Sequence, residues 1–176
     1  MKIAVLLLLV FLFCVFSCSE LGQKNAPNIG LSPKDSTIRA NLGVLVDSCW
    51  NNQDTTLLTE ISVENFVRHL NGIQIAVSKR EMQAHMNVFF TAFPDLKITL
   101  DTLTINNNKA FLEWTSSGTN TGIYGEVAPT GKKVKMKGFS HLHFTDDGVL
   151  SREDVYYNEL DLLQQLGYTL NPPILE

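Results

Sequence analysis

Residues 78–100 read SKREMQAHMNVFFTAFPDLKITL, and the spacing of the hydrophobic residues changes within this stretch. Ser78 and Glu81 have the spacing of a helix-capping box, and Pro94 is expected to end the helix. Before Pro94 the apolar side chains recur at helical intervals, at Met82, Met86, Phe89, Phe90 and Phe93. From Leu96 onward apolar and polar residues alternate, as in a strand with one buried face. The stretch therefore predicts that a helix is followed by a sheet.

The pattern before this stretch is mainly helical. Residues 32–35, Ser-Pro-Lys-Asp, supply an N-cap and a proline for the first turn of an amphipathic helix expected over 33–51. The apolar side of that helix consists of Ile38, Leu42, Leu45, Val46, Cys49 and Trp50. A short helix is expected over 54–61 and a short extended piece over 65–70.

The pattern after Leu96 predicts extended stretches separated by turns at 106–108, 129–131 and 146–148. A final helical turn is expected over 158–167. Helices followed by an antiparallel meander predict an α+β domain. Helices that cover one face of a curved sheet can leave a pocket between the two layers. The aromatic candidates for the wall of that pocket are Trp50, Phe66, Phe89, Phe93 and Trp114, each of which has core packing as the alternative.

Composition limits the class of protein. The chain has 176 residues, of which 44% are hydrophobic and 18% charged, as expected for one globular domain. Its 18 acidic and 14 basic residues give a net charge of −4, which argues against nucleic acid as a partner. Cys49 lies in the apolar stripe of the first helix and is expected to be a buried structural thiol.

The N-terminal region has the layout of a secretory signal. Lys2 precedes the uncharged run 3–17, which is shorter than the roughly 20 residues of a membrane-spanning helix. Residues 15–18, Val-Phe-Ser-Cys, resemble a bacterial lipobox, so Cys18 is expected to be acylated and to anchor the protein to a membrane. A cleaved signal without lipid and an uncleaved anchor are the alternatives.

These features predict four regions and a location. Residues 1–17 form a signal peptide, 18–31 a lipidated tether, 32–170 the folded domain and 171–176 a C-terminal tail. The expected location is the bacterial cell envelope, on a periplasmic or surface membrane face.

Six segments occur in the order found in the SnoaL-like polyketide cyclase, or ester cyclase, family: FVRH (66–69), AFPDLKI (92–98), EWTSSGTNTG (113–122), APTGKKV (128–134), DGVLSRE (147–153) and LLQQLG (162–167). The chain resembles this family, which belongs to the nuclear-transport-factor-two-like superfamily. The resemblance implies a cone-shaped fold with N-terminal helices packed on a curved, mainly antiparallel sheet. It also implies a homodimer that forms through the open face of the sheet.

The resemblance implies a reaction as well. Named members close a ring by intramolecular aldol condensation without a metal or organic cofactor. Such chemistry needs a carboxylate base in an apolar cavity and hydrogen-bond donors near the developing oxyanion. The family's aspartate matches Asp154 or a direct neighbour, while Ser140 and Asn120 occupy positions where the family has histidines. The expected ligand is a small hydrophobic, oxygenated molecule, and a non-catalytic binding or carrier module is the alternative.

Further substrate-binding candidates follow from the same resemblance. His69 matches a histidine near the mouth of the family's pocket, and Asn158 stands where many members have another aspartate. Tyr156 is a third candidate, beside Asp154 in the last strand.

His141 and His143 lie two residues apart on one strand face, a spacing that could ligate a metal. Gly138 and Ser140 are expected to define the pocket side of this strand, so the two histidines are assigned to the outer or dimer-facing side. A cupin-like site would need a later histidine, which the sequence lacks. No metal site and no cofactor are therefore expected.

Overall fold

A computed structural model describes residues 32–126 and 128–172 of the chain. The predicted signal peptide, Cys18 and the tether lie outside the described residues, as does most of the predicted tail. The folded unit that contains the described residues spans Leu31–Glu176.

The helices begin at the residues that the capping patterns indicate. Their bounds are Pro33–Gly43 (α2), which continues into the π-helix Val44–Asn51 (η1), the 3₁₀-helix Thr55–Leu57 (η2), Leu58–Ile61 (α3), Lys79–Ala92 (α4) and Glu159–Leu166 (α5). The Ser32 hydroxyl accepts a hydrogen bond of 3.0 Å from the Asp35 amide, and the Ser78 hydroxyl accepts one of 3.2 Å from the Glu81 amide. Each bond satisfies a backbone donor in the first turn of a helix.

The strands form one six-stranded mixed sheet. They are Ser62–Leu70 (β1), Ile73–Ala76 (β2), Lys97–Asn106 (β3), Lys109–Thr119 (β4), Lys133–Phe144 (β5) and Leu150–Tyr157 (β6). Their order is β2-β1-β6-β5-β4-β3, and only the β1–β6 pair is parallel. The parallel pair makes the sheet mixed. Strands β3, β4, β5 and β6 form the antiparallel meander that the spacing predicted.

Strand β2 is absent from the sequence-based prediction. It pairs with β1 through the two-residue turn Asn71–Gly72, where φ is +50° and +84°. Asn-Gly is the usual sequence of such hairpin turns, because both residues tolerate positive φ. This dipeptide was the available signal, and β1 also extends further than the piece expected over 65–70.

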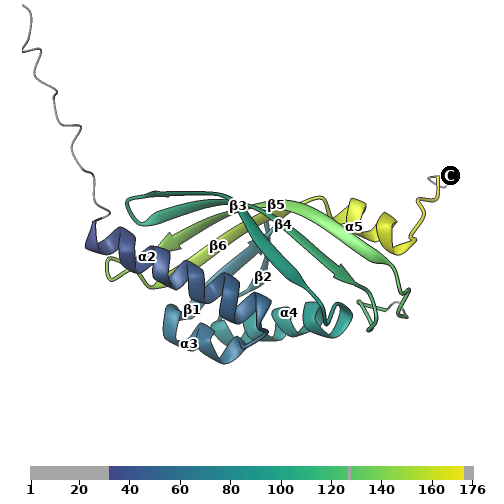
Figure 1. Cartoon of the computed structure of the whole chain (residues 1–176), viewed down its shortest axis with the longest axis horizontal. Helices are drawn as coiled ribbons and strands as arrows, with labels where there is room; N and C mark the ends of the chain where they lie inside the picture. The colour runs from purple at the N-terminus through teal and green to yellow at the C-terminus, as the bar shows by residue number, and fades with distance from the viewer. Residues whose placement is uncertain (1–31, 127, 173–176) are drawn as a thin grey trace, which may run out of the picture. The chain divides into compact units, whose positions relative to one another are not determined.

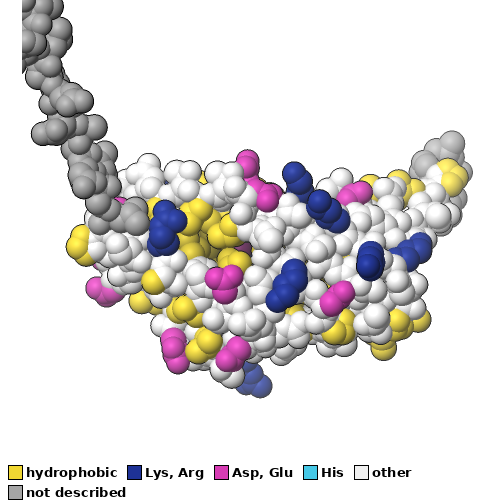
Figure 2. Space-filling model, in the orientation of Figure 1, with side chains coloured by type: hydrophobic (Ala, Val, Ile, Leu, Met, Phe, Trp, Pro, Cys, Tyr) yellow, Lys and Arg dark blue, Asp and Glu magenta, His cyan; other side chains and the backbone are white. Residues whose placement is uncertain are grey.

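The helices α2, α3 and α4 lie against one face of the curved sheet, and α5 lies near one end of it (Figure 1). We call the face toward α2, α3 and α4 the inner face and the opposite one the outer face. The main hydrophobic core fills the space between the helices and the inner face. Acidic and basic side chains are interspersed on the surface shown in Figure 2. Among the described residues, none of the helices has both the length and the hydropathy needed to cross a membrane.

Cys49 is fully buried in this core and forms no disulfide with any residue of the described ranges. Burial raises the pKa of its thiol to about 11, and the nearby charge of Asp54 contributes in the same direction. Little thiolate therefore exists near neutral pH, which agrees with a structural role.

Candidate functional site

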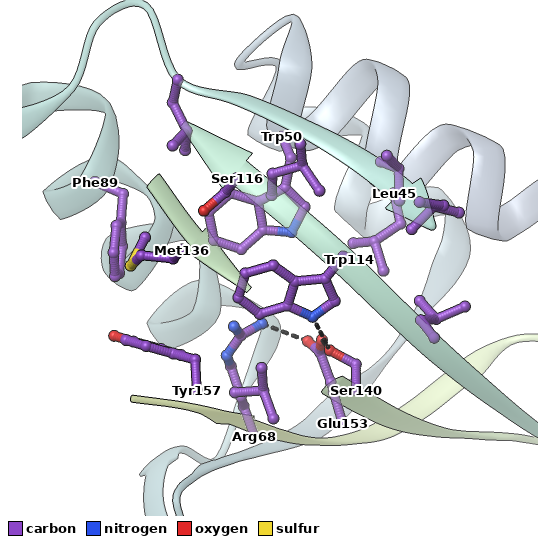
Figure 3. Close-up of a pocket in the computed structure, with 16 residues that line it drawn as sticks. Leu45, Trp50, Arg68, Phe89, Trp114, Ser116, Met136, Ser140, Glu153 and Tyr157 are labelled. Atoms are coloured by element: carbon purple, nitrogen blue, oxygen red, sulfur yellow. Dashed lines mark hydrogen bonds and ion pairs between the residues drawn. The ribbon is translucent and has the colours of Figure 1, made fainter. Parts of the chain in front are cut away.

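A pocket lies between the helices and the inner face of the sheet (Figure 3). Its apolar wall consists of Leu45, Val46, Trp50, Phe89, Leu96, Ile98, Leu100, Leu112, Trp114, Met136, Val155 and Tyr157. Four polar residues also line the pocket: Arg68, Ser116, Ser140 and Glu153. The cavity volume is about 60 Å³, room for only a few water molecules. In this conformation the pocket suits a small occupant.

A hydrogen-bonded chain crosses the polar end of the pocket. The Arg68 guanidinium forms an ion pair with Glu153, and these side chains are only 7% and 6% exposed. The Ser140 hydroxyl donates a hydrogen bond of 2.9 Å to the other carboxylate oxygen of Glu153, and Trp114 Nε1 donates one of 3.1 Å to the same hydroxyl. A buried ion pair needs such additional hydrogen bonds to offset the loss of hydration.

The Arg68 side chain is held from two sides. Its guanidinium carbon lies 5.5 Å from the centre of the Trp50 ring, a cation–π distance, and Nη1 lies 3.7 Å from Met82 Sδ. Arg68 comes from β1, Trp50 from η1 and Glu153 from β6. The pair therefore connects the first helical segment to the centre of the sheet.

Three polar atoms of the pocket residues have unused hydrogen-bonding capacity. Arg68 Nε, Ser116 Oγ and the Tyr157 hydroxyl are buried and have no hydrogen-bond partner among the described residues. Burial raises the pKa of Tyr157, and the charges of Tyr124 and Glu159 and a contact with the Tyr124 hydroxyl contribute, so the Tyr157 hydroxyl stays protonated and can donate. The contact with Tyr124 lacks the geometry of a full hydrogen bond. Buried donors are nearly always satisfied in folded proteins. All three atoms belong to residues that line the pocket.

Four of the predicted pocket residues line the pocket: Trp50, Phe89, Trp114 and Ser140. Phe66 and Phe93 do not line it, because both are fully buried in the hydrophobic core. For these two residues the alternative of core packing is correct.

The prediction that Asp154 faces the pocket is wrong by one residue. In the β5–β6 pair, Val155 lies opposite Ser140, and Asp154 lies opposite His141. Directly paired residues share a face, and successive residues of a strand alternate between faces. Glu153 and Val155 therefore point inward with Ser140, and Asp154 points outward. The sequence did not reveal this pairing.

Two other candidates from the end of the chain also lie away from the pocket. Tyr156 lies two residues after Asp154 on β6, so its side chain points to the same outer face, and it is 48% exposed. The Asn158 side chain is the N-cap of α5 and accepts a hydrogen bond of 3.1 Å from the Asp161 amide. Their positions fit an outer-face residue and a helix cap, respectively.

His69 and Asn120 have other surroundings. His69 Nδ1 lies 3.1 Å from Asp154 Oδ1 on the outer face. Asn120 is 1% exposed, and its amide joins two loop segments by donating to the Gly122 carbonyl and accepting from the Thr130 amide, both at 2.8 Å. Asn120 does not line the pocket, so its position favours a structural role.

Arg68 and Glu153 are the charged pocket residues that the sequence analysis missed. The alternation of side chains along a strand could have predicted that both point inward, because Arg68 shares a face of β1 with Phe66, and Glu153 shares a face of β6 with Val155. Phe66, two residues before Arg68, and Val155, two residues after Glu153, are apolar and fully buried. An apolar residue two positions away was the available signal.

Gly138 makes room for the Trp114 indole. A Cβ atom at this position would lie 2.2 Å from Trp114 Cζ2. We expect Gly138→Ala to displace the indole, break its hydrogen bond to Ser140 and lower the free energy of unfolding by about 1–3 kcal/mol. Urea denaturation and the tryptophan emission spectrum measure the two effects.

Gly43→Ala is the matched control for Gly138→Ala. Gly43 has helical dihedral angles, and a Cβ atom there would have no neighbour within 4 Å. The control is expected to stabilise the protein by about 0.4–1 kcal/mol and to leave the emission unchanged. Equal behaviour of the two variants would show that Gly138 does not position Trp114.

Comparison with known proteins agrees with this architecture. AclR from Streptomyces galilaeus, a proposed hydroxylase, superposes with a TM-score of 0.68 at 23% identity, covering 78% of this chain and 85% of AclR. A proposed SnoaL-like polyketide cyclase from Jannaschia sp. CCS1 gives 0.72 at 18% identity, covering 82% and 99%. IdmH from Streptomyces antibioticus, a proposed polyketide cyclase, gives 0.64 at 18% identity, covering 74% and 99%. At these identities the structures establish the fold alone.

A search of curated proteins found no match. The sequence profile of the SnoaL-like polyketide cyclases matches residues 42–166, well over half of the chain. This segment contains every strand of the sheet and the whole pocket. The chain therefore belongs to the SnoaL-like polyketide cyclase family.

Proposed function

We propose that the pocket binds a small, mainly apolar molecule that carries an oxygen acceptor. Three pocket residues each carry a buried polar atom that makes no well-formed hydrogen bond among the described residues, and the rest of the pocket wall is largely apolar. This observation supports the proposal most directly. An apolar pocket with a few convergent polar groups is the usual form of a small-molecule site. A ketone or ester oxygen would accept a hydrogen bond from the Tyr157 hydroxyl, whose contact with Tyr124 is not a well-formed hydrogen bond.

Intrinsic fluorescence can test this proposal directly, because both tryptophans of the chain, Trp50 and Trp114, line the pocket. Cyclohexanone is a suitable probe, and methylenecyclohexane has the same shape without the oxygen. We expect cyclohexanone to change the emission in a saturable way. Tyr157→Phe, which removes only the hydroxyl, should weaken its binding about two- to tenfold and leave methylenecyclohexane unaffected.

Tyr156→Phe is the matched control, because Tyr156 is the neighbouring tyrosine on the outer face. It should leave the binding of both probes unchanged. Lack of saturation with cyclohexanone, or equal effects of the two tyrosine variants, would reject the proposal.

We propose cofactor-free acid–base chemistry of the aldol cyclase or isomerase type as a second candidate function, with Glu153 as the base. The family membership and the position of Glu153, one residue from the predicted Asp154, support this candidate. The ion pair with Arg68 argues for binding alone, since a paired carboxylate is a weaker base than one in apolar surroundings. Ser140 cannot shuttle protons near neutral pH as a histidine can.

Deuterium exchange separates binding from catalysis. A base in the pocket would accelerate exchange of the α-hydrogens of cyclohexanone in D₂O, which NMR measures without knowledge of the natural substrate. We expect Glu153→Gln to abolish any acceleration and Asp154→Asn to preserve it. The opposite result would identify Asp154 as the base. Saturable binding without acceleration of exchange would favour a non-catalytic binding or carrier module.

We propose further that the protein is a lipoprotein of the cell envelope, acylated at Cys18. The lipobox-like residues 15–18 and the preceding apolar run support this. Cells fed labelled palmitate should label the wild type and Cys14→Ala, because Cys14 belongs to the cleaved signal, but not Cys18→Ala. Label on the Cys18→Ala protein would contradict the proposal.

We propose that the protein forms a homodimer through the outer face. The family resemblance supports this, as do Phe139 and Tyr156, which are 38% and 48% exposed. Sedimentation equilibrium should give twice the chain mass, and a single monomeric species at every loading concentration would contradict it.

A further inference from the structure

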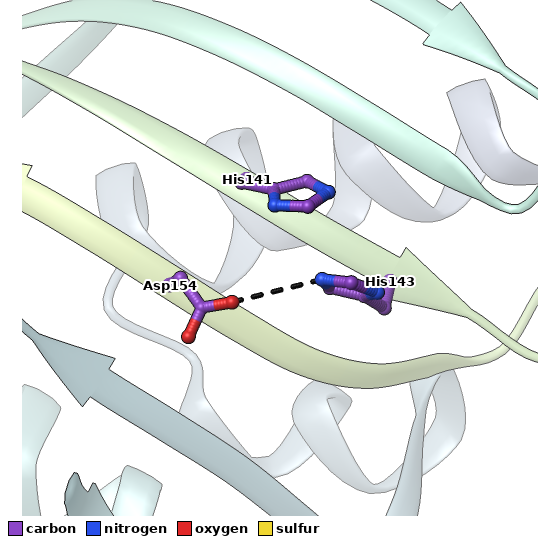
Figure 4. Close-up of side chains that lie close together, drawn as sticks. All are labelled: His141, His143 and Asp154. Carbon is purple, nitrogen blue, oxygen red and sulfur yellow. Dashed lines mark ion pairs between the residues drawn. The ribbon is translucent and has the colours of Figure 1, made fainter. Parts of the chain in front are cut away.

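Three of the four histidines of the chain gather around Asp154 on the outer face. His69 of β1 and His141 of β5 each lie opposite Asp154 of β6, one on either side. His143 follows His141 by two residues and shares its face. Figure 4 shows the His141, His143 and Asp154 side chains close together above the sheet. Strand pairing thus gathers residues that are far apart in the sequence.

The distances suit ligands of one ion. One ligand atom from each of His141, His143 and Asp154 lies within 4.8 Å of the others, and His143 Nε2 lies 3.6 Å from Asp154 Oδ2. Ligand atoms around tetrahedral zinc are about 3.3 Å apart, given metal–ligand bonds of about 2.0–2.1 Å. Small side-chain rotations would bring the three atoms to that separation.

A ring nitrogen of the cluster lacks a hydrogen-bond partner among the described residues. His141 Nε2 is buried and makes no hydrogen bond within the described part of the chain. The His141 ring stacks on Phe111, with centroids 4.6 Å apart and planes inclined by 10°, which restricts its orientation. The His143 ring lies beside it, at 4.1 Å between centroids. An oriented imidazole with an unpartnered nitrogen is suited to a metal ion.

The protonation states are compatible with metal binding. Burial lowers the pKa of His141 and His143, and the positive charge of Lys109 contributes at both, so their imidazoles are neutral near neutral pH. At Asp154, burial acts to raise the pKa, but the hydrogen bonds and charge of Arg152 outweigh it and hold the carboxylate ionised. Neutral imidazole and ionised carboxylate are the forms that coordinate a metal.

We propose that His141, His143 and Asp154 bind a divalent transition metal of the zinc class on the outer face of the sheet. The three protein ligands leave the remaining coordination position to water, to an external ligand or, in the proposed dimer, to a group of the partner chain. This site lies on the opposite side of the sheet from the pocket and is independent of the proposed ligand.

Two neighbours of Asp154 modify the site. Arg152 donates hydrogen bonds of 2.8–3.0 Å to both carboxylate oxygens. Each carboxylate oxygen has two lone pairs, so Oδ2 can accept from Arg152 and still coordinate the ion. His69 Nδ1 lies 3.1 Å from Oδ1 on the other side, without the geometry of a full hydrogen bond. The positive charge of Arg152 opposes a cation, so the site is weaker than one without it.

Cobalt(II) titration tests the proposal on the full chain carrying Cys14→Ser and Cys18→Ser, which removes the two N-terminal thiols as ligands. After treatment with a chelator, Co²⁺ should bind at one ion per chain, with the visible absorption of low-coordinate Co²⁺, and Zn²⁺ should displace it. His143→Ala and Asp154→Asn should each weaken binding at least tenfold. Arg152→Gln should strengthen it about two- to fivefold.

His85→Gln is the matched control, because His85 belongs to α4 and is the histidine outside the cluster. It should bind Co²⁺ as the wild type does. Circular dichroism establishes that each variant is folded. A stoichiometry well below one, or binding that His143→Ala and Asp154→Asn weaken no more than His85→Gln does, would overturn the proposal.

Discussion

Arg68→Met is expected to lower the free energy of unfolding by about 3–5 kcal/mol, the cost of leaving one member of a buried ion pair without its partner. Glu153 is 5% exposed, and Ser140 is the other group that hydrogen-bonds its carboxylate. Methionine fills a similar volume without the charge, so the loss reports the uncompensated carboxylate. Urea denaturation measures it, with circular dichroism as the readout.

Adding Glu153→Gln to Arg68→Met tests the cause. Removing both charges should restore most of the lost stability, because no unpaired charge then remains in the core. Lys34→Met is the control on the surface, where the Lys34–Asp146 pair lies at 2.9 Å with Asp146 92% exposed. That variant should lose at most about 1 kcal/mol. A double variant as unstable as Arg68→Met would assign the loss to packing of the arginine side chain.

His85 is expected to make the protein sensitive to acid. Burial lowers its pKa from 6.5 to about 4, and the positive charge of Arg68 contributes. Above pH 6.5 the imidazole is neutral in both the folded and the unfolded chain, so it has no effect on the pH dependence. As the pH falls from 6.5 toward 4, only the unfolded chain binds the proton, and stability decreases by roughly 3 kcal/mol in total.

The His85→Gln variant isolates this contribution. Its stability should fall less steeply than that of the wild type between pH 6.5 and 4, and the two slopes should agree above pH 6.5. Free energies of unfolding from urea titrations across this range give both slopes. Parallel slopes throughout would mean that His85 titrates normally in the folded protein.

The helices and turns were predictable because their signals are local. Ser32 and Ser78 cap the helices where the sequence places them, and Gly167 ends the last one with φ of +109°. The face of a strand is different, because strand pairing depends on residues distant in the chain. On β5 the glycine that accommodates Trp114 revealed the inner face, so Ser140 was assigned correctly.

Strand β6 offered no comparable signal. Its inner face carries Glu153, Val155 and Tyr157, and its outer face carries Arg152, Asp154 and Tyr156, so both faces combine charge with aromatic character. The family resemblance pointed to Asp154, one residue from the acid that faces the pocket. Only the pairing of β6 with β5 identifies which acid faces the pocket.

Glu153 and Asp154 also affect how relatives should be compared, because these adjacent acids of β6 point to opposite faces of the sheet. A single residue gained or lost in the turn at 146–148 would shift the register and exchange the faces of the two positions. Alignments of such homologues would still match acid with acid while the side chains pointed in opposite directions. Roles should therefore be transferred between homologues by strand partner, starting from the residue opposite Ser140, and not by chemical identity.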